Sequence, residues 1–417
     1  MPRPPLTYKE SLVWLYGLQR FGIKLGLENT RRLLEELDLV TARVSPQTSG
    51  KVIHVAGTNG KGSVCAMIDS ISRAQGYRTG LFTSPHLVTF RERIRVNGDM
   101  ISEQDVAIGL TRIRDLVGNW DPHPTFFEVV TALALKHFAD TKIEIVILET
   151  GLGGRLDATN AIQSNVSVIT SINFDHEKWL GDTLSQIAAE KAGIIKPGVP
   201  VVCAPQRPEA EEVIRARAAQ CGAPIRFVTA PYEETPVALA GAHQKQNAAL
   251  AIAALRVAEI DVDNSSIAQG LAAIDWPGRF QRWDTRTIID GAHNPGAAQL
   301  VAQTWRENFG DQRATLILAI LADKNLHAIC EALVPISQFV VLPKIRSERA
   351  ADPEELVKIL ANITPPLPYS IVPSVADALA LAHAKPNPIL ITGSLHFAGE
   401  VLAHLRGEPA AFEECAQ

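Results

Sequence analysis

The residues best suited to chemistry lie in a glycine-rich stretch that begins at position 57. Residues 52–56 (VIHVA) are mostly apolar and β-branched, which predicts a buried strand. Gly57-Thr58-Asn59-Gly60-Lys61-Gly62-Ser63 follows, and residues 65–74 are predicted to form a helix. Glycines let backbone N–H groups approach a phosphate closely, the helix N-terminus adds partial positive charge, and Lys61 adds a full charge. This unit therefore predicts a nucleotide phosphate site.

The spacing of this stretch differs from the common phosphate-loop pattern, which has four residues between its first glycine and its Gly-Lys pair. Here Thr58 and Asn59 alone separate Gly57 from Gly60, and Gly62 precedes the hydroxyl residue. The alternative is a structural turn with incidental glycines. The lysine and the serine both stand where a nucleotide needs them, so the pattern favours the phosphate site.

Polar side chains also follow three further predicted strands. They are Ser84 after residues 78–83, Glu149 after residues 143–148 and His176 after residues 166–172. Because ligands of open parallel sheets bind beyond the carboxyl ends of the strands, we expect these side chains near the phosphate site. A hydroxyl and a carboxylate suit Mg²⁺, whereas an imidazole suits Mn²⁺ better. Each residue alone also fits a structural role, as a turn cap, an ion-pair partner or a hydrogen-bonded polar group.

The order of predicted elements indicates an α/β fold in two parts. Strands alternate with helices up to about residue 273, which is typical of a parallel sheet covered on both faces. Residues 276–284 (WPGRFQRWD) break this rhythm, and the alternation then restarts. We expect a phosphate-loop ATPase domain over residues 1–280 and a smaller Rossmann-like α/β domain over residues 281–417.

Composition indicates a soluble globular protein and excludes several classes. The 417 residues are 46% hydrophobic and 20% charged, with a net charge of −5, so no overall basic field favours nucleic acid. The sequence contains no run of about 18 uncharged apolar residues, so we expect no membrane span. The opening Met-Pro-Arg-Pro-Pro does not predict a signal peptide. Five scattered cysteines suit a reducing cytoplasm rather than a cysteine metal site.

Longer stretches around these residues resemble the folylpolyglutamate synthase and dihydrofolate synthase family, a branch of the Mur ligase superfamily. The N-terminal stretches are HVAGTNGKGS (54–63), FTSPHL (82–87), LETGLGGRLDATN (148–160), TSINFDHEKWLG (170–181) and AAEKAGIIKPG (188–198). The C-terminal stretches are PGRF (277–280), IIDGAHNP (288–295) and ITGSLHFAGEV (391–401). The resemblance covers nearly the whole chain.

The resemblance implies that the chain joins a carboxylate to the amino group of L-glutamate with ATP and two Mg²⁺ ions. An acyl phosphate forms first, and the amine then displaces phosphate, so the enzyme mainly positions groups and stabilises charge. Lys61 would neutralise the β- and γ-phosphates, and Ser63 would lie near the first metal ion. Ser84, Glu149 and His176 would hold the ions.

The resemblance also implies that Lys191 is carbamylated by CO₂, which turns a cation into a carboxylate. Without the family, a surface lysine on a helix is the simpler interpretation. Matching ATP contacts are Asn247, Arg279 and Asp290, and His293 is a further catalytic residue beside them. Asn247 alone could instead be a helix cap.

Three segments match the family's contacts to folate or pteroate. They are Lys24-Leu25-Gly26, Thr125-Phe126-Phe127-Glu128 and Leu156-Asp157-Ala158. At position 24 some bifunctional members carry aspartate, whereas this chain has lysine. Phe126 and Phe127 could instead belong to the hydrophobic core.

The main prediction is a bifunctional enzyme that makes dihydrofolate from dihydropteroate and then adds γ-linked glutamates to reduced folates. A folylpolyglutamate synthase without the first activity is the nearest alternative. A peptidoglycan Mur ligase would need a nucleotide-sugar domain before the phosphate site, but 56 residues precede Gly57. A GTPase switch would need an Asn-Lys-x-Asp signature, and residues 322–325 (ADKN) have the wrong order. We expect a cytoplasmic monomer that binds small molecules but no nucleic acid or membrane.

Overall fold

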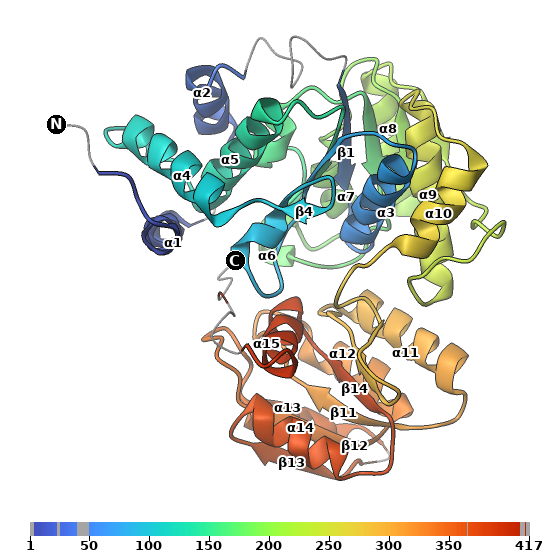
Figure 1. The fold of residues 1–417 in the computed structure, drawn as a ribbon. Helices are drawn as coiled ribbons and strands as arrows, with labels where there is room; N and C mark the ends of the chain where they lie inside the picture. Colours follow the sequence, from blue (N-terminus) through green and yellow to red (C-terminus); the bar gives the residue numbers. More distant parts are fainter. Residues whose placement is uncertain (1–3, 23–25, 40–49, 365, 409–412, 414–417) are drawn as a thin grey trace.

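The computed structural model of this chain describes residues 4–22, 26–39, 50–364, 366–408 and 413. They form two layered α/β parts, each with its own sheet (Figure 1). We call the elements up to α10 the N-terminal part and those from β9 onward the C-terminal part. Residues 274–280 link the two.

Within the described residues, the sheet of the N-terminal part has eight strands in the order β4-β3-β2-β5-β1-β6-β7-β8. They are β1 (Lys51–Ala56), β2 (Thr79–Phe82), β3 (Ile94–Val96), β4 (Asp99–Met100), β5 (Ile145–Glu149), β6 (Val166–Ile169), β7 (Val201–Cys203) and β8 (Ile225–Phe227). All neighbours pair in parallel except β2–β3 and β3–β4. Strand β1 lies between β5 and β6, so the loops that follow these three strands meet at one edge.

Among the described residues of this part, ten α-helices pack around the sheet. They are α1 (Tyr8–Gly17), α2 (Glu28–Glu36), α3 (Lys61–Ala74), α4 (Glu103–Val117), α5 (Phe126–Asp140), α6 (Glu177–Leu180), α7 (Leu184–Ala192), α8 (Pro208–Gln220), α9 (Ala242–Val257) and α10 (Asn264–Ala273). Strand β1 is buried on both faces, as its sequence predicts: Ile53 and Val55 join the apolar cluster with α3, α9 and α10, whereas Val52 joins the cluster with α4 and α5. Short 3₁₀ helices η1 (Leu18–Phe21), η2 (Phe90–Arg93) and η3 (Ala158–Ala161) complete this part.

As far as the structure describes it, the C-terminal part has a six-stranded sheet in the order β13-β12-β11-β14-β10-β9. Its strands are β9 (Gln281–Arg282), β10 (Thr287–Ile289), β11 (Ala314–Leu318), β12 (Ser337–Pro343), β13 (Tyr369–Val372) and β14 (Ile389–Thr392). Its helices are α11 (Pro295–Phe309), α12 (Leu326–Leu333), α13 (Pro353–Asn362), α14 (Val375–His383) and α15 (Leu395–Leu405), with the 3₁₀ helix η4 (Val334–Ile336). Only β9 is antiparallel to its neighbour in this sheet. Two apolar clusters cover its faces.

The structure corrects three of the predicted boundaries. The helix after the phosphate loop begins at Lys61 rather than at residue 65, because the N–H of Val64 already donates to the carbonyl of Gly60. Strand β6 ends at Ile169 rather than at residue 172, because the carbonyl of Ser171 turns to accept the N–H of Thr58. Charged and apolar residues alternate in residues 90–96 (FRERIRV), which predicts a half-exposed strand or a loop, but the structure forms η2 and then β3 there.

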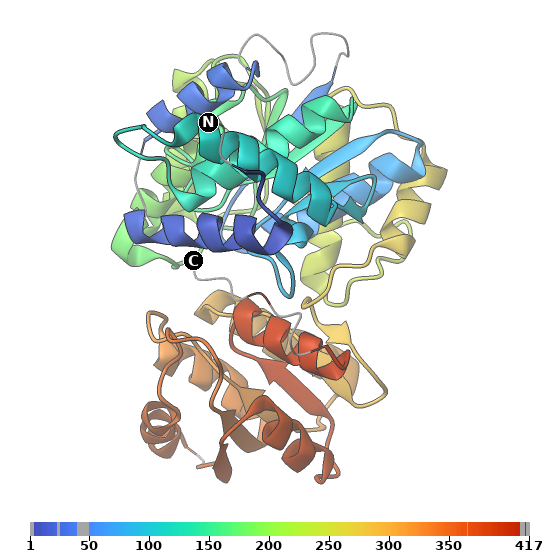
Figure 2. The same cartoon turned by 60° about the vertical axis from the view of Figure 1, so that its left-hand side comes forward.

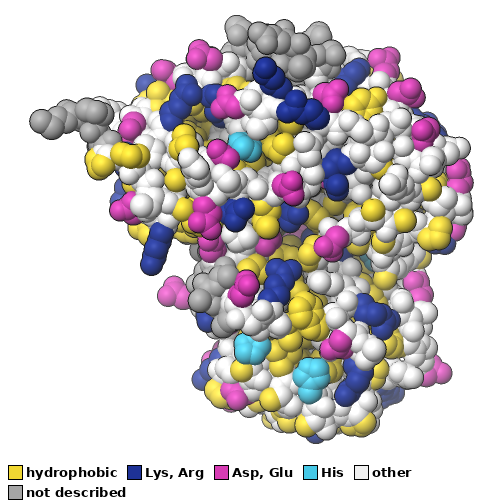
Figure 3. Space-filling model, in the orientation of Figure 1, with side chains coloured by type: hydrophobic (Ala, Val, Ile, Leu, Met, Phe, Trp, Pro, Cys, Tyr) yellow, Lys and Arg dark blue, Asp and Glu magenta, His cyan; other side chains and the backbone are white. Residues whose placement is uncertain are grey.

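Figure 3 shows positive and negative side chains interspersed over this face of the molecule, with no large patch of one sign. Across the described residues, no helix is both long enough and apolar enough to cross a membrane.

Candidate active site

The phosphate loop, residues 57–60, is held against the end of β6. The N–H of Thr58 donates to the carbonyl of Ser171 at 2.9 Å. Gly57 and Gly60 have φ angles of 150° and 92°, where other residues are strained. A Cβ on Gly57 would lie 1.8 Å from the Thr170 hydroxyl, and one on Gly60 would lie 2.8 Å from Asn247 Oδ1. Both glycines are therefore required by the conformation and the space of the loop.

Two lysines flank the phosphate loop. Lys61, in the first turn of α3, donates to the carbonyl of Thr58 at 3.3 Å. Lys191, on α7, is 4% exposed and donates to the carbonyl of Gly57 at 2.9 Å. Burial, reinforced by the charge of Lys61, lowers the pKa of Lys191 to about 7. The interpretation of Lys191 as a surface lysine is therefore wrong.

Ser84 and Glu149 lie together on one side of the phosphate loop. Ser84 follows β2, Glu149 is the last residue of the neighbouring parallel strand β5, and the N–H of Ser84 donates to Glu149 Oε2 at 3.1 Å. Burial raises the pKa of Glu149, although the charge of Lys61 and the Ser84 hydrogen bond oppose this. A buried carboxylate with Lys61 as its main opposing charge is suited to bind a cation.

His176 lies on the other side, next to a buried carboxylate. His176 adopts a left-handed conformation with φ 54°, directly before α6. Burial lowers its pKa to about 4, although the Asp175 carboxylate opposes this. Its ring is therefore neutral at pH 7, the form in which imidazole binds metals.

Asp175 connects the two parts of the molecule. Its carboxylate lies 2.7 Å from Lys324 Nζ and 3.4 Å from His293 Nε2, and it accepts a hydrogen bond from Asn294 Nδ2 at 3.1 Å. These three partners follow β10 and β11 in the C-terminal part. Burial favours the neutral acid, but the hydrogen bond and charge of His293, with His176 and Lys324, hold the pKa of Asp175 well below its usual range.

Sequence reasoning missed Lys324 and Asn294. Asn294 also exchanges hydrogen bonds of 3.2 and 3.0 Å with Asn59, in the phosphate loop. Both residues follow the carboxyl ends of C-terminal strands, which is the same positional signal that identified Ser84 and Glu149.

The donor atoms of this site fit divalent cations that take most of their ligands from phosphate and water. Within the part of the chain that the structure describes, no three His, Cys, Asp or Glu side chains gather around one point. The candidates instead form two sets, the hydroxyl of Ser84 with the carboxylate of Glu149, and the ring of His176. Mg²⁺ bound beside nucleotide phosphates needs one or two protein ligands and several waters, so each set is sufficient.

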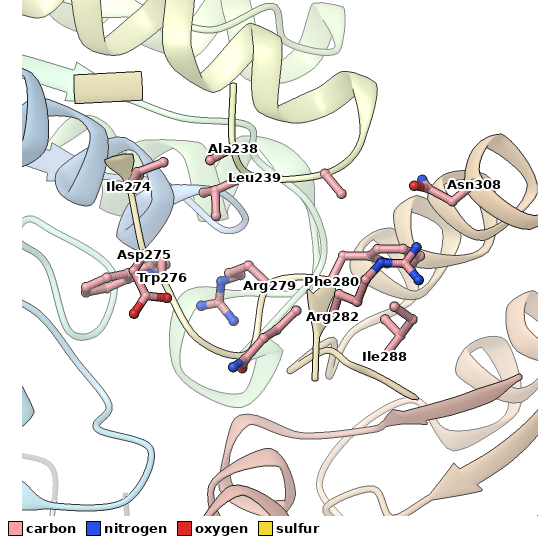
Figure 4. A pocket seen from close by; sticks show the side chains of 12 residues that line it. Ala238, Leu239, Ile274, Asp275, Trp276, Arg279, Phe280, Arg282, Ile288 and Asn308 are labelled. Atoms are coloured by element: carbon pink, nitrogen blue, oxygen red, sulfur yellow. The ribbon is translucent and has the colours of Figure 1, made fainter. Parts of the chain in front are cut away.

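The expected ATP contacts surround the phosphate loop and the linker. Asn247 lies inside α9 with its side chain against Gly60, so it is not a helix cap. The Asp290 carboxylate accepts from the N–H groups of Phe280 and Ala292 at 2.7 and 2.8 Å, and burial raises its pKa. Arg279 points into a cavity of about 320 Å³ between the two parts (Figure 4).

The expected folate segments differ in what they expose. Phe126 is 6% exposed and stacks on Tyr16 at 5.6 Å, so it belongs to the core. Phe127 is half-buried against Gly151, where an added Cβ would lie 2.5 Å from its ring. Thr125 and Glu128 form the capping box of α5.

Asp157 has both carboxylate oxygens occupied by the loop that carries it. They accept from the N–H groups of Gly151, Leu152 and Thr159 and from the Thr159 hydroxyl. Leu156 and Ala158 flank it, and Ala158 is buried at the start of η3. Gly26 precedes α2, whereas Lys24 and Leu25 lie outside the described residues.

Comparison with known proteins places this site in a family. The model of the Mur ligase middle domain matches residues 55–218, and that of the Mur ligase glutamate ligase domain matches residues 278–395. Dihydrofolate synthase/folylpolyglutamate synthase of Bacillus subtilis is 34% identical, covering 96% of this chain and 99% of the relative. The chain belongs to the dihydrofolate synthase/folylpolyglutamate synthase family of Mur ligases.

Solved structures of this family share the whole fold. Escherichia coli FolC in complex with DHPP and ADP superposes with a TM-score of 0.85 and 31% identity, covering 98% of this chain and 99% of that one. The Yersinia pestis bifunctional folylpolyglutamate synthase/dihydrofolate synthase with AMPPNP and Mn superposes with a TM-score of 0.86 and 31% identity, covering 97% and 99%. The predicted family, α/β fold class and enzyme class, an ATP-dependent ligase, are confirmed.

Proposed function

We propose that this enzyme joins L-glutamate to dihydropteroate, giving dihydrofolate, and then to the γ-carboxylate of reduced folates. The main observation behind this proposal is that Lys61 and the two sets of candidate metal ligands, Ser84 with Glu149 and His176, surround one phosphate loop. The γ-phosphate of ATP passes to the substrate carboxylate, and the glutamate amine then attacks the acyl phosphate and releases phosphate. The names and ligands of the relatives support ATP and a divalent cation as cofactors.

The residues around the loop have separate roles in this proposal. Lys61 binds the β- and γ-phosphates and offsets the charge that develops during transfer. Ser84 and Glu149 would hold one Mg²⁺, and His176 would hold the second. The bound ions supply charge neutralisation on the transferring phosphoryl group.

Lys191 forms a carbamate in this proposal. Its neutral Nζ attacks the carbon of CO₂, an N–C bond forms, one C=O π bond becomes the carboxylate, and the displaced proton leaves to water. The lowered pKa supports this, because the free amine is the nucleophile. Carbamylation therefore replaces the positive charge of Lys191 beside the phosphate loop with a negative one.

The remaining predicted contacts divide between the two substrates. Asn247, Arg279 and Asp290 bind the nucleoside of ATP near the linker, and His293 acts beside them at the C-terminal part. Folate or pteroate contacts Gly26 and the segments 125–128 and 156–158. In these segments Phe127 has the partly exposed ring that can contact the substrate. Phe126 and Asp157 instead support the site, Phe126 through core packing and Asp157 through hydrogen bonds to its own loop.

The division into residues 1–280 and 281–417 remains our proposal for the domains. Two sheets with separate apolar clusters support it. We also propose a cytoplasmic monomer that binds no nucleic acid. The mixed charges on the face shown in Figure 3 support the last of these points.

One assay tests this function. Purified enzyme receives ATP, Mg²⁺ and radiolabelled glutamate, with dihydropteroate in one tube and tetrahydrofolate in another. Labelled product in both tubes is expected. Product with tetrahydrofolate alone identifies a folylpolyglutamate synthase without the first activity. No product in either tube contradicts the proposal.

A further inference from the structure

The chain that follows β2 packs into the core of the C-terminal part. Val88 is 5% exposed and lies in one apolar cluster with Ile289 and Phe397. Leu87 packs against the same cluster. We call residues 84–89 the docking loop. It makes a contact between the two parts that is separate from the covalent linker at residues 274–280.

The docking loop approaches α15 at backbone distance. A Cβ on Gly399 would lie 1.9 Å from the carbonyl oxygen of Leu87, so only glycine fits there without movement. Figures 1 and 2 both show α15 as the helix of the C-terminal part closest to the light-blue chain after β2. Leu87 therefore packs directly against the backbone of α15.

The docking loop is held together as one unit. The Glu92 carboxylate accepts the N–H groups of Leu87, Val88 and Thr89 at 2.8, 3.0 and 3.1 Å. Glu413, close to the C-terminus, donates its N–H to the carbonyl of Val88 at 2.8 Å and accepts the Thr89 hydroxyl at 3.1 Å. A displacement of α15 thus moves several residues of the loop together.

Ser84 is the first residue of the docking loop, three residues before Leu87, and its N–H donates to the Glu149 carboxylate. We propose that the docking loop is a positioning device that places Ser84 against Glu149 when the C-terminal part is docked on it. The contact of Gly399 with Leu87 then couples the arrangement of the two parts to the cation site. This inference rests on the proposed function, because it takes Ser84 and Glu149 as cation ligands.

The test compares Gly399→Ala and Val88→Ala with wild type and with a control, Gly17→Ala. Gly17 has an ordinary φ of −59°, and an added Cβ there meets nothing within 4 Å. Gly399→Ala pushes the loop away from α15, whereas Val88→Ala removes apolar contact without adding bulk. Thermal unfolding checks that each variant is folded.

The readout is the affinity of the full-length enzyme for Mn²⁺ in the presence of ADP, measured by electron paramagnetic resonance. Binding of ADP without metal is measured in parallel. We expect both docking-loop variants to bind Mn²⁺ about fivefold or more weakly, a typical coupling between sites, with ADP affinity unchanged. A merely structural role would weaken both ligands together.

Wild-type Mn²⁺ affinity in both docking-loop variants would overturn the inference, as would an equal loss in Gly17→Ala or a parallel loss of metal-free ADP binding. Failure of the proposed function would be seen differently. Wild-type enzyme would then form no glutamate product, whatever the Mn²⁺ titrations show.

Discussion

Lys191 Nζ donates a hydrogen bond of 2.9 Å to the carbonyl oxygen of Gly57, the first residue of the phosphate loop. The lysine is buried on α7, and this is the single hydrogen bond that its amine makes with the described residues. A charged ammonium is costly in such a place, because its partner is a carbonyl rather than a carboxylate. The geometry therefore favours a neutral amine that can react.

We predict that Lys191 binds CO₂ with a pH dependence set by its lowered pKa. Below about pH 7 the amine is mostly protonated and cannot attack, and above it the nucleophilic form dominates. At a fixed concentration of dissolved ¹³CO₂, a protein carbamate signal in the ¹³C NMR spectrum should grow as pH rises through 7. Lys191→Ala should lose the signal. A wild-type spectrum without it across this range would contradict the carbamate.

Lys61→Ala should lower kcat by about 100-fold or more, because it removes a charge that stabilises the transferring phosphoryl group. Steady-state turnover with each folate substrate measures this. Lys51→Ala is the matched control, since Lys51 lies at the start of β1, the strand that leads into the phosphate loop, and pairs with exposed Glu259 at 3.5 Å. Near-normal turnover in Lys61→Ala would remove Lys61 from the mechanism.

The sequence predicted the strand–loop–helix unit and the edge of the sheet at which chemistry occurs, because both follow from local patterns. Buried β-branched runs marked β1 and β5, and polar residues at their ends marked Glu149 and its neighbours. The start of α3 was predicted too late, because glycines were interpreted as loop although Gly62 lies within the helix. Such a boundary depends on the phosphate-loop geometry more than on residue propensity.

Contacts between the two parts could not be derived from the sequence. Lys324 and Asp175 are 149 residues apart, and they meet because the loop after β11 in the C-terminal part lies against the loop after β6. In the sequence alone, residues 322–325 (ADKN) show only a guanine-binding signature in the wrong order. Likewise, no sequence pattern shows that the Asp157 carboxylate accepts hydrogen bonds from its own loop. These bonds depend on the conformation of the turn that Asp157 caps.

Asp157→Asn should destabilise the protein by about 1–3 kcal/mol, the cost of leaving buried donors unpaired. The Asp157 carboxylate accepts from four donors, three of them backbone N–H groups. An amide offers one oxygen and turns its own NH₂ toward the remaining donors. Urea denaturation measures the change, with exposed Asp99→Asn as the control. Equal stability of the two variants would show that these hydrogen bonds contribute little.

Lys324→Met should destabilise the enzyme by about 3 kcal/mol at pH 7, because it leaves a buried carboxylate without its closest cation. The side chains of Lys324 and Asp175 are 6% and 7% exposed and lie 2.7 Å apart. Lys344→Met is the control, since Lys344 is exposed on the same part of the molecule. Urea denaturation at several pH values measures the free energy of unfolding of each variant.

The pH dependence separates this ion pair from a simple packing effect. Asp175 has a pKa below that of the unfolded chain, so its contribution to stability is present above about pH 4 and is lost as pH falls further. Part of that lowering comes from Lys324. Wild type should therefore lose more stability than Lys324→Met between pH 7 and acid conditions, and the two should converge. A difference in unfolding free energy that stays constant with pH would instead assign the effect of Lys324 to its aliphatic chain, because packing does not titrate.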